Sequence, residues 1–498
     1  MTVSQAETHY LDYFVIILNI IVILFLVALN GFFVASEFSI VKVRPSRLDT
    51  LIKEGSKSAV YARQVTEHLD AYLSVTQLGI TLASLGLGWI VSRERFLRDS
   101  RTVDLLKLRA SVGKNGWDPM GEMRYLWEGY YTGRGGLNTG NSEHTWHGGT
   151  ALSYLPNPGI FAEKSLKYDA GIDLRLWNRL SLNVDLFLEK RSGIVTQDWM
   201  IPGASGVDNP PYRNIGRMTN KGFEVQLSWA DRIGDFNYAL TGMASYNSNK
   251  VDYMAEVVTV PTAARTGRRL DALFGYVADG FYDWDDFDVG GELREGLPKP
   301  TFGAVQPGDI KYKNLNGDTV IDENDQTAIG DSYLPKLQYS FSLAASYKGF
   351  DLFALFQGAA GRDVNLLDAP LQNIAFRDNG NVYGIAEGRW AYYPEQGIDT
   401  RATAIYPRLS LQDNSNNYRN STLWKRSGDF LKLRNVELGY TFAQPSLSKA
   451  GISKIRIYLS GVNLLTVSRL MRDYDIDPEI LSGHPALKSY NLGLTVTF

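Results

Sequence analysis

The chain contains no cysteine among its 498 residues and only five histidines. The absence of cysteine excludes disulfide frameworks and zinc or iron–sulfur sites with thiolate ligands. A strong charge of either sign is also missing, because 51 basic residues nearly balance 54 acidic ones and leave a net charge of −3. This balance gives no reason to expect nucleic acid as a partner. The sequence shows no nucleophile elbow, catalytic triad order or zinc-protease motif, so an enzyme is the least expected class of protein.

The residues that are abundant are typical of a mainly β protein with large loops. Tyrosine (28), tryptophan (10) and glycine (47) are plentiful. Stretches rich in serine, threonine and asparagine separate short apolar runs, as they do between strands. With 44% hydrophobic and 21% charged residues, the chain is neither disordered nor built of membrane helices throughout.

The first ninety or so residues differ from the rest of the chain. Tyr13 to Ala35 is an almost unbroken apolar run that is long enough for a membrane-spanning helix. A secretory signal is the alternative, but no basic residue precedes the run and no small-residue cleavage site follows it. Tyr72 to Val91 is a milder second span, and the basic amphipathic segment between them, Lys42 to Asp70, is expected in the cytoplasm. We therefore predict two transmembrane α-helices within residues 1–91, followed by a linker over 92–104.

Three motifs in this segment are specific together: Leu29-Asn-Gly-Phe-Phe-Val-Ala-Ser-Glu-Phe38, Val41–Leu48 and Thr76–Ile90. With them, residues 12–90 resemble the start of the CorC/CNNM transmembrane domain, a hemolysin-related family associated with magnesium export. The family's third span and cytosolic nucleotide-binding domains have no counterpart after these motifs. The resemblance implies ion handling by polar residues at a break in the first span, namely Asn30, Gly31, Ser36 and Glu37. A helix break with a capping cluster near the membrane surface is the alternative interpretation.

After Arg93 the pattern changes to an alternation of apolar and polar residues, which is the period of a β-strand. In the last stretch, Tyr490, Leu492, Leu494, Val496 and Phe498 would share one face of a strand. The same alternation predicts about ten antiparallel strands, at residues 105–113, 168–176, 180–189, 223–229, 236–247, 337–347, 350–356, 435–442, 455–460 and 490–498.

Short and long connections alternate between these strands. The short ones are Trp177–Arg179, Ala230–Asp235, Lys348–Gly349 and Gln444–Ser453, and the long ones are 116–163, 193–220, 250–336, 358–429 and 469–489. Short turns at one end with long outer loops at the other are typical of outer-membrane barrels, and faces carrying Asp, Glu and Arg suit a water-filled interior. We predict a transmembrane β-barrel portion over residues 105–498, with a soluble β-sandwich as the alternative.

Several motifs in this region are distinctive when they occur together. They are Leu106–Gly113, Asn157-Pro158, Asn214–Glu224, Gly275–Gly280, Pro307–Tyr312, Phe430–Tyr440, Val462–Leu465 and Asp477-Pro-Glu479. With them, residues 95–498 resemble the carboxy-terminal half of the SusC/RagA family of TonB-dependent outer-membrane transporters. The family's plug domain, TonB-contacting segment and first barrel half have no counterpart here.

The SusC/RagA resemblance implies a location, a substrate class and partners. The location is the outer membrane of a Gram-negative, Bacteroidetes-like cell, and the substrates are glycans or peptides taken up beneath a surface lipoprotein of the SusD type. The final aromatic residue, Phe498, would be the signal for the outer-membrane assembly machinery. Because the plug and the TonB contact are missing, we do not expect energised transport by this chain alone.

One loop has the ligand spacing of a calcium site. Positions 1, 3, 5, 7, 9 and 12 are taken by Asn314, Asn316, Asp318, the carbonyl of Val320, Asp322 and Asp325. The glycine, Gly317, stands at position 4 instead of 6, and position 12 is Asp instead of Glu. The spacing predicts bound Ca²⁺, and an Asx-rich surface turn is the alternative.

Two aromatic residues in another long stretch, Tyr282 and Trp284, are candidates to line the path of a sugar or peptide. A solvated outer loop would account for these residues equally well. No cofactor other than Ca²⁺ is expected.

Three functions stay open at this point. The chain would be an outer-membrane uptake barrel, an inner-membrane magnesium or cation transporter fragment acting through residues 13–91, or a soluble glycan-binding β-protein. The linker between the first two parts, fully extended, reaches roughly 45 Å, which is too short to join two membranes. We therefore interpret the chain as a fusion of two fragments near Ile90–Arg93, either natural or a junction of unrelated coding segments. The barrel contains most of the residues and motifs, so the principal expected partner is membrane lipid.

Overall fold

The computed structural model describes most of the chain from residue 102 onward and short pieces before it. The described residues are 21–22, 25–29, 31–33, 48, 52–53, 55–67, 102–117, 126–139, 145–202, 204, 209–258, 260–369, 382–411, 414–442 and 451–498.

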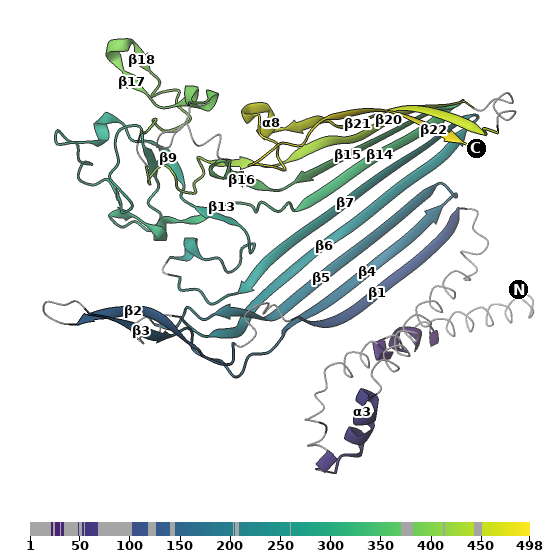
Figure 1. Ribbon diagram of the computed structural model, residues 1–498, viewed down its shortest axis with the longest axis horizontal. Coiled ribbons are helices and arrows are strands. Elements are labelled where there is room, and N and C mark those ends of the chain that lie inside the picture. Colours follow the sequence, from purple (N-terminus) through teal and green to yellow (C-terminus); the bar gives the residue numbers. More distant parts are fainter. Residues whose placement is uncertain are drawn as a thin grey trace, which may run out of the picture. The chain divides into compact units, whose positions relative to one another are not determined.

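Ten strands form the main sheet. In their hydrogen-bonded order they are β1 (Val103–Trp117), β4 (Glu163–Leu176), β5 (Leu180–Gln197), β6 (Tyr212–Ile233), β7 (Phe236–Tyr253), β14 (Leu337–Tyr347), β15 (Phe350–Ala360), β20 (Phe430–Phe442), β21 (Lys454–Ser468) and β22 (Ser489–Thr497). From β7 to β22 each pair is antiparallel, and these strands run side by side in Figure 1. Among the described strands, β22 has one neighbour, β21. The predicted mainly-β fold is confirmed.

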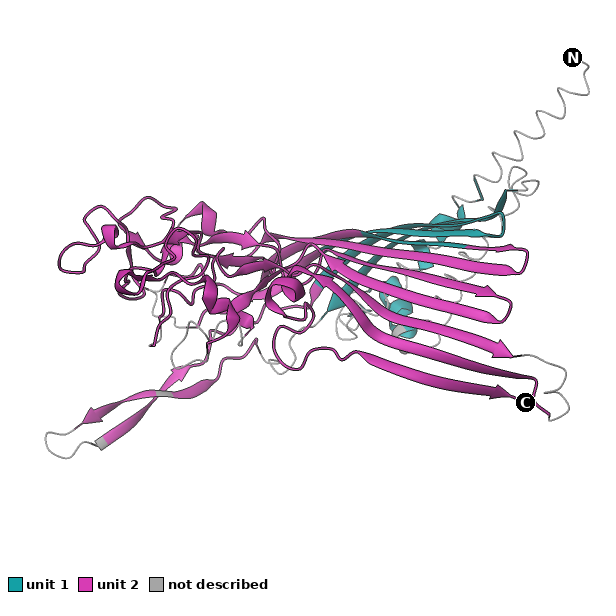
Figure 2. Ribbon diagram, turned by 90° about the horizontal axis from the view of Figure 1, so that it is seen from above, with its two compact units in different colours: residues 1–117, 164–190, 223–229 teal, residues 118–163, 191–222, 230–498 magenta. Residues whose placement is uncertain are grey.

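The chain divides into two compact units, coloured separately in Figure 2. Unit 1 comprises residues 1–117, 164–190 and 223–229, and unit 2 comprises residues 118–163, 191–222 and 230–498. In unit 1, the guanidinium of Arg109 on β1 donates to Asp173 on β4 and to Asp185 on β5, with both N–O distances at 2.9 Å. Ion pairs therefore join neighbouring strands on the face that the sequence pattern marks as polar.

In unit 2 the register lines up aromatic residues beside the short turns. Phe236 pairs with Tyr347, Tyr347 with Phe350, and Phe350 with Tyr440. The rings of the last pair are 4.5 Å apart. Aromatic girdles of this kind mark the membrane interface of outer-membrane barrels.

The apolar face of these strands is not covered by protein in the described part of the chain. Leu459 on β21 is 55% exposed and Leu492 on β22 is 79% exposed. On the opposite face, Arg456 makes a 3.0 Å hydrogen bond to Asp351 and a 2.5 Å hydrogen bond to Glu437. A sandwich would bury its apolar face and expose its charges, whereas this arrangement suits lipid outside and water inside.

The short turns use the backbone conformations that tight hairpins require. Lys348 and Gly349 both have positive φ, 45° and 90°, as a two-residue type I′ turn demands. The predicted connection Ala230–Asp235 is shorter than expected, because β6 continues to Ile233 and leaves Gly234 and Asp235 as the turn. Gly234 has φ 60°, which a glycine adopts without steric cost.

The long connections fold into small elements of their own. These are β2 (Tyr131–Thr139), β3 (Thr145–Leu152), β8 (Leu273–Gly275), β9 (Ala278–Phe281), β10 (Lys299–Pro300), β11 (Ile310–Tyr312), β12 (Val320–Ile321), β13 (Thr327–Gly330), β16 (Asp363–Asn365), β17 (Tyr392–Tyr393), β18 (Ile398–Asp399), β19 (Lys425–Ser427), α8 (Arg469–Tyr474) and the 3₁₀ turns η2 (Pro261–Ala263), η3 (Trp284–Asp286), η4 (Glu323–Asp325), η5 (Leu366–Asp368), η7 (Gly384–Gly388) and η8 (Pro394–Gln396). In Figure 1 the elements labelled β9, β13, β16, β17 and β18 lie beyond the strand ends opposite the short turns. Their shared apolar core includes the fully buried Ile310, Leu366, Trp424 and Leu470.

The helical segment near the start of the chain is described only in part. Of the two predicted spans, 13–35 is mostly and 72–91 wholly outside the described residues. Where the structure does describe helix, no stretch is both long enough and apolar enough to cross a membrane. Helix α3 (Lys57–Glu67) lies in the segment predicted to be basic and amphipathic, and its Ala59 is buried.

Candidate functional site

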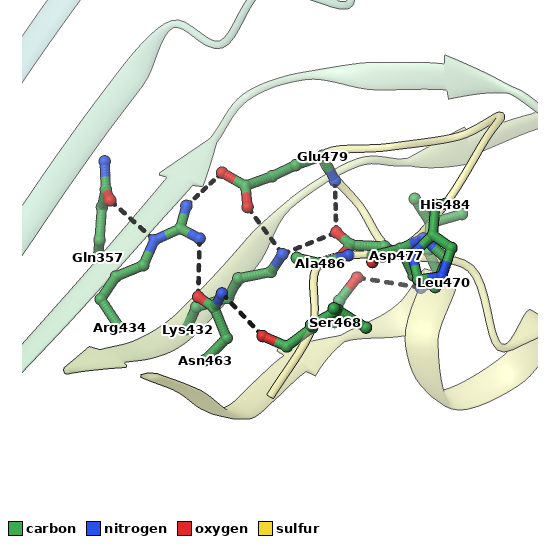
Figure 3. A network of polar contacts seen from close by, with 12 residues as sticks. Gln357, Lys432, Arg434, Asn463, Ser468, Leu470, Asp477, Glu479, His484 and Ala486 are labelled. Carbon is green, nitrogen blue, oxygen red and sulfur yellow. Dashed lines mark hydrogen bonds and ion pairs between the residues drawn. The ribbon is translucent and has the colours of Figure 1, made fainter. Parts of the chain in front are cut away.

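A buried ion network joins strand β20 to the loop that follows α8 (Figure 3). The ammonium of Lys432 lies 2.7 Å from an oxygen of Asp477 and 2.7 Å from an oxygen of Glu479. The other oxygen of Glu479 accepts a hydrogen bond from the guanidinium of Arg434. The side chains of Lys432 and Asp477 are only 1% and 4% exposed. Two cations from one strand thus hold two carboxylates from one loop.

Arg434 follows Lys432 by two residues, so both side chains lie on the same side of strand β20, and a β-bulge lies at Arg434. On the neighbouring strand β15, Leu355 pairs with Asn435 whereas the next residue, Phe356, pairs with Leu433. Arg434 is therefore an extra residue, and bulges of this kind redirect side chains near functional sites. The bulge also reverses the alternation, so that apolar residues have odd numbers before it and even numbers after it.

The environment of the loop carboxylates favours their charged forms. Burial opposes ionisation of Asp477, but hydrogen bonds from Lys432 and from the backbone N–H of Glu479 outweigh it and hold the pKa of Asp477 below its usual value. Burial likewise opposes ionisation of Glu479, and hydrogen bonds from Arg434 and Lys432 outweigh it, so the pKa of Glu479 is also lowered. Both carboxylates are therefore charged at neutral pH.

A cavity of about 680 Å³ lies beside α8. One wall comes from the segment around η7 and the residues that pair with it, including Tyr383, Ile385, Ile405 and Tyr406, and the other wall comes from α8 with Tyr474 and Asp475. This volume is within the range of sites for small ligands, and mixed aromatic and charged lining is usual there. These residues are far apart in the chain and form no motif, so the sequence does not predict the cavity.

A partly buried arginine fixes two tyrosines of this cavity. The guanidinium of Arg426 donates to the hydroxyl of Tyr474 at 2.6 Å and to that of Tyr406 at 3.3 Å. The two hydroxyls are 3.2 Å apart, and burial raises the pKa of Tyr406. The ring of Tyr406 also stacks on Trp424, with centroids 6.0 Å apart. These contacts hold Tyr406 and Tyr474 in place on the two walls of the cavity, and Tyr406 stays uncharged near neutral pH.

The predicted calcium loop is a compact turn held by its own hydrogen bonds. Asp325 accepts from the N–H of Leu315 at 2.7 Å, and Asp318 accepts from the N–H of Val320 at 2.8 Å. Asp322 and Asp325 form the capping box of η4. Within the described ranges, no group of three or more His, Asp or Glu side chains is placed to hold a metal ion. Ca²⁺ binding by Asn314, Asn316, Asp318, Val320, Asp322 and Asp325 stays a prediction.

The remaining predicted residues lie in different places. Tyr282 is buried with Phe287 and two aliphatic residues, and burial raises its pKa to about 12. Trp284, two residues later, is largely exposed on η3. Phe498 directly follows β22 and is exposed. Gly31 is in a described helical piece, whereas Asn30, Ser36 and Glu37 lie outside the described residues.

The fold and the register define a portion of a β-barrel with folded outer loops. Residues 70–464 match the family described as TonB dependent receptor-like, beta-barrel. The chain therefore belongs to this family of outer-membrane receptors. A separate match, to the cyclin M transmembrane N-terminal domain, covers residues 21–94.

Curated relatives agree with this division of the chain. TonB-dependent receptor P26 of Formosa agariphila is 29% identical over 449 residues, which cover 83% of this chain and 42% of that protein. TonB-dependent receptor SusC of Bacteroides thetaiotaomicron is 24% identical over 453 residues, covering 84% and 40%. UPF0053 protein YhdP of Bacillus subtilis is 58% identical over 72 residues, covering 14% of this chain and 16% of that protein. Both predicted resemblances are confirmed, and together they are consistent with a fusion.

A solved structure, the RagAB peptide importer in the 'open-open' state, superposes with a TM-score of 0.57 at 21% identity and covers 81% of this chain and 41% of that chain. At this identity the likeness supports the fold. The chain spans about two fifths of the length of the curated receptors that it matches.

Proposed function

We propose that residues 105–498 form part of the barrel of an outer-membrane importer for glycans or peptides. The single observation that carries this is the sheet with two unlike faces: an apolar face left uncovered, as at Leu459 and Leu492, and an opposite face bearing ion pairs such as Arg456 with Asp351. The aromatic row beside the short turns supports the same orientation in a membrane.

The relatives support the class of cargo that we propose. One relative is named SusC, and the superposed structure is titled a peptide importer. We infer a SusD-type surface lipoprotein as the partner that delivers cargo, and the outer-membrane assembly machinery as the partner that reads Phe498. The inner-membrane alternative is supported only by the short match over residues 21–94.

Two further parts of the proposal concern this chain in particular. We infer that the barrel portion, residues 105–498, does not perform energised transport alone, since the family that it matches is described as the β-barrel of such receptors. We also retain Ca²⁺ as a ligand of the Asn314–Asp325 loop, on the basis of its ligand spacing.

Membrane fractionation of the full chain tests the location and the barrel together. The expected result is that the protein separates with outer-membrane markers, resists alkaline extraction and migrates faster on a gel before boiling than after it. An inner-membrane marker protein in the same cells is the control. Recovery of the chain in the inner membrane would favour the cation-transporter alternative, and recovery in the soluble fraction would contradict both membrane assignments.

A further inference from the structure

We propose that Lys432 and Arg434 are positioning residues that hold the α8 wall of the 680 Å³ cavity closed. The proposal rests on the proposed function for its meaning, because it concerns access to a cavity among the barrel's outer loops. The link between the cavity wall and the ion network does not depend on the membrane in which the protein lies. The end of α8 supplies Tyr474 and Asp475 to the cavity, and the loop that follows directly supplies Asp477 and Glu479 to the network on β20.

The connection between wall and network is short and stiff. α8 begins at the cap Ser468, whose hydroxyl accepts from the N–H of Leu470 at 3.2 Å, and it ends at Asp475 in the left-handed conformation. The N–H of Ile476 then donates to the carbonyl of Leu470 at 3.2 Å. Only one residue separates Asp475, on the cavity, from Asp477, on Lys432. Displacement of the carboxylates from β20 must therefore displace the cavity wall as well.

Besides its contact with Lys432, the carboxylate of Asp477 also holds the loop through backbone hydrogen bonds. Asp477 accepts from the N–H of Glu479 at 2.9 Å and from that of Ala486 at 3.3 Å. The hydroxyl of Tyr333 donates to the carbonyl of Glu479 at 3.2 Å. One side chain thus orders both ends of the loop segment while it neutralises Lys432.

The ion pair between Lys432 and Asp477 is suited to a loop that can open and close. Lys432 and Asp477 are both removed from water, and the cost of burying two ions is of the same order as their mutual attraction. Opening the loop rehydrates both ions, so the intact pair stabilises closure only modestly. Loss of one partner is different, because it leaves a buried charge without compensation whenever the wall is closed. Together with the hydrogen bond from Arg426 to Tyr474, the two cations therefore determine the position of the wall more than the stability of the whole fold.

Cysteine labelling provides a direct test, because the chain contains no native cysteine. The reporter is Ile476→Cys, at a position only 7% exposed beneath the wall. Val305→Cys, buried in the separate core around Tyr282, reports on unfolding elsewhere in the loops. The full chain is labelled with a maleimide in the outer-membrane fraction, or in whichever fraction contains it, so that an unexpected location does not prevent the measurement.

Lys432→Met is expected to raise the labelling rate of the Ile476 reporter on the order of 100-fold and to leave the Val305 reporter protected. Lys432→Met with Asp477→Asn removes both charges and is expected to restore most of the protection. Lys313→Met, which breaks only an exposed pair with Asp279 away from this cavity, is the matched control and should change neither reporter.

Two outcomes would overturn the proposal. One is equal labelling of the Ile476 reporter in the unsubstituted and Lys432→Met backgrounds. The other is simultaneous exposure of both reporters, which would show that Lys432 supports the whole loop fold and not the wall. Neither outcome bears on the outer-membrane location, which the fractionation decides separately.

Discussion

Arginine substitutions along strand β14 test which face of the sheet meets lipid. Leu343 pairs with Leu240 and Ala354 on the apolar face, whereas its neighbour Ser342 is on the face that carries the ion pairs. β14 has 11 residues, close to the roughly 9–11 that a tilted strand needs to cross the hydrocarbon. Leu343→Arg and Ser342→Arg are therefore at the same depth and differ only in the face that they alter.

The structure sets the expected size of the effect. Leu343 is four residues from Tyr347 in the aromatic row, which is about 13 Å along the strand and about 10 Å in height at a tilt near 40°. This is close to half of an apolar band about 25 Å tall. We expect Leu343→Arg to cost about 2–4 kcal/mol of folding free energy, Tyr347→Arg at the interface about 0–1 kcal/mol, and Ser342→Arg little.

Urea titration of the folded chain in phospholipid vesicles, read from heat-modifiable gel mobility, measures these differences. The unsubstituted chain and Leu343→Ala serve as references for lost packing. If Ser342→Arg were as costly as Leu343→Arg, the assignment of faces would be wrong. If Tyr347→Arg were as costly as Leu343→Arg, the aromatic row would not mark the interface.

Three further predictions concern the loops. Because their folded-state pKa values are lowered, Asp477 and Glu479 stabilise the closed loop above their unfolded pKa values of about 3.9 and 4.3, and this stabilisation is lost as the pH falls through the folded values. The maleimide labelling rate at Ile476→Cys, divided by the rate of a small free thiol at the same pH to cancel the loss of thiolate, should therefore rise in acid. Asp309 is fully buried and accepts hydrogen bonds from Arg408 at 2.8 Å and from two asparagines. Asp309→Asn should therefore lower the free energy of unfolding of the loops by about 3 kcal/mol, measured by urea-dependent proteolysis. Asp399→Asn, at the surface, should change this free energy little. Calorimetry should show Ca²⁺ binding that Asp318→Ala and Asp322→Ala abolish. The calcium prediction would be refuted if the unsubstituted chain gave no heat of Ca²⁺ binding.

The sheet could be predicted from the sequence where its two faces meet different surroundings. The residues predicted for β14, 337–347, are those of the structure. The alternation predicts β6 only over 223–229, but the strand runs from Tyr212 to Ile233, 22 residues or roughly 70 Å. This length exceeds the hydrocarbon thickness. Where the strand projects into water on both faces, no apolar–polar alternation is required, and the periodic signal disappears.

The site could not be predicted from alternation or from local motifs. The bulge at Arg434 reverses the alternation within β20, so a single continuous alternation predicts the strand only from residue 435 onward, after the bulge. Lys432 and Asp477 are 45 positions apart, and nothing in the intervening residues specifies their contact. Long-range pairs of this kind depend on the topology of the strands, which the sequence pattern does not encode. Spacing identified the Asn314–Asp325 loop because its contacts are local, yet spacing alone does not separate a metal site from a self-bonded turn.

Among the strands that the structure describes, β22 stands at the end of the strand order, which has a consequence for how this polypeptide can exist in a bilayer. Amide and carbonyl groups along its outer side find no water in hydrocarbon, and each one left unbonded costs several kcal/mol. Nine residues present enough such groups to outweigh the stability of an ordinary domain. In the membrane, then, β22 requires a second strand along its outer side. Whether such a strand is available therefore determines, separately from the loops and the ion network, whether the protein accumulates in the membrane.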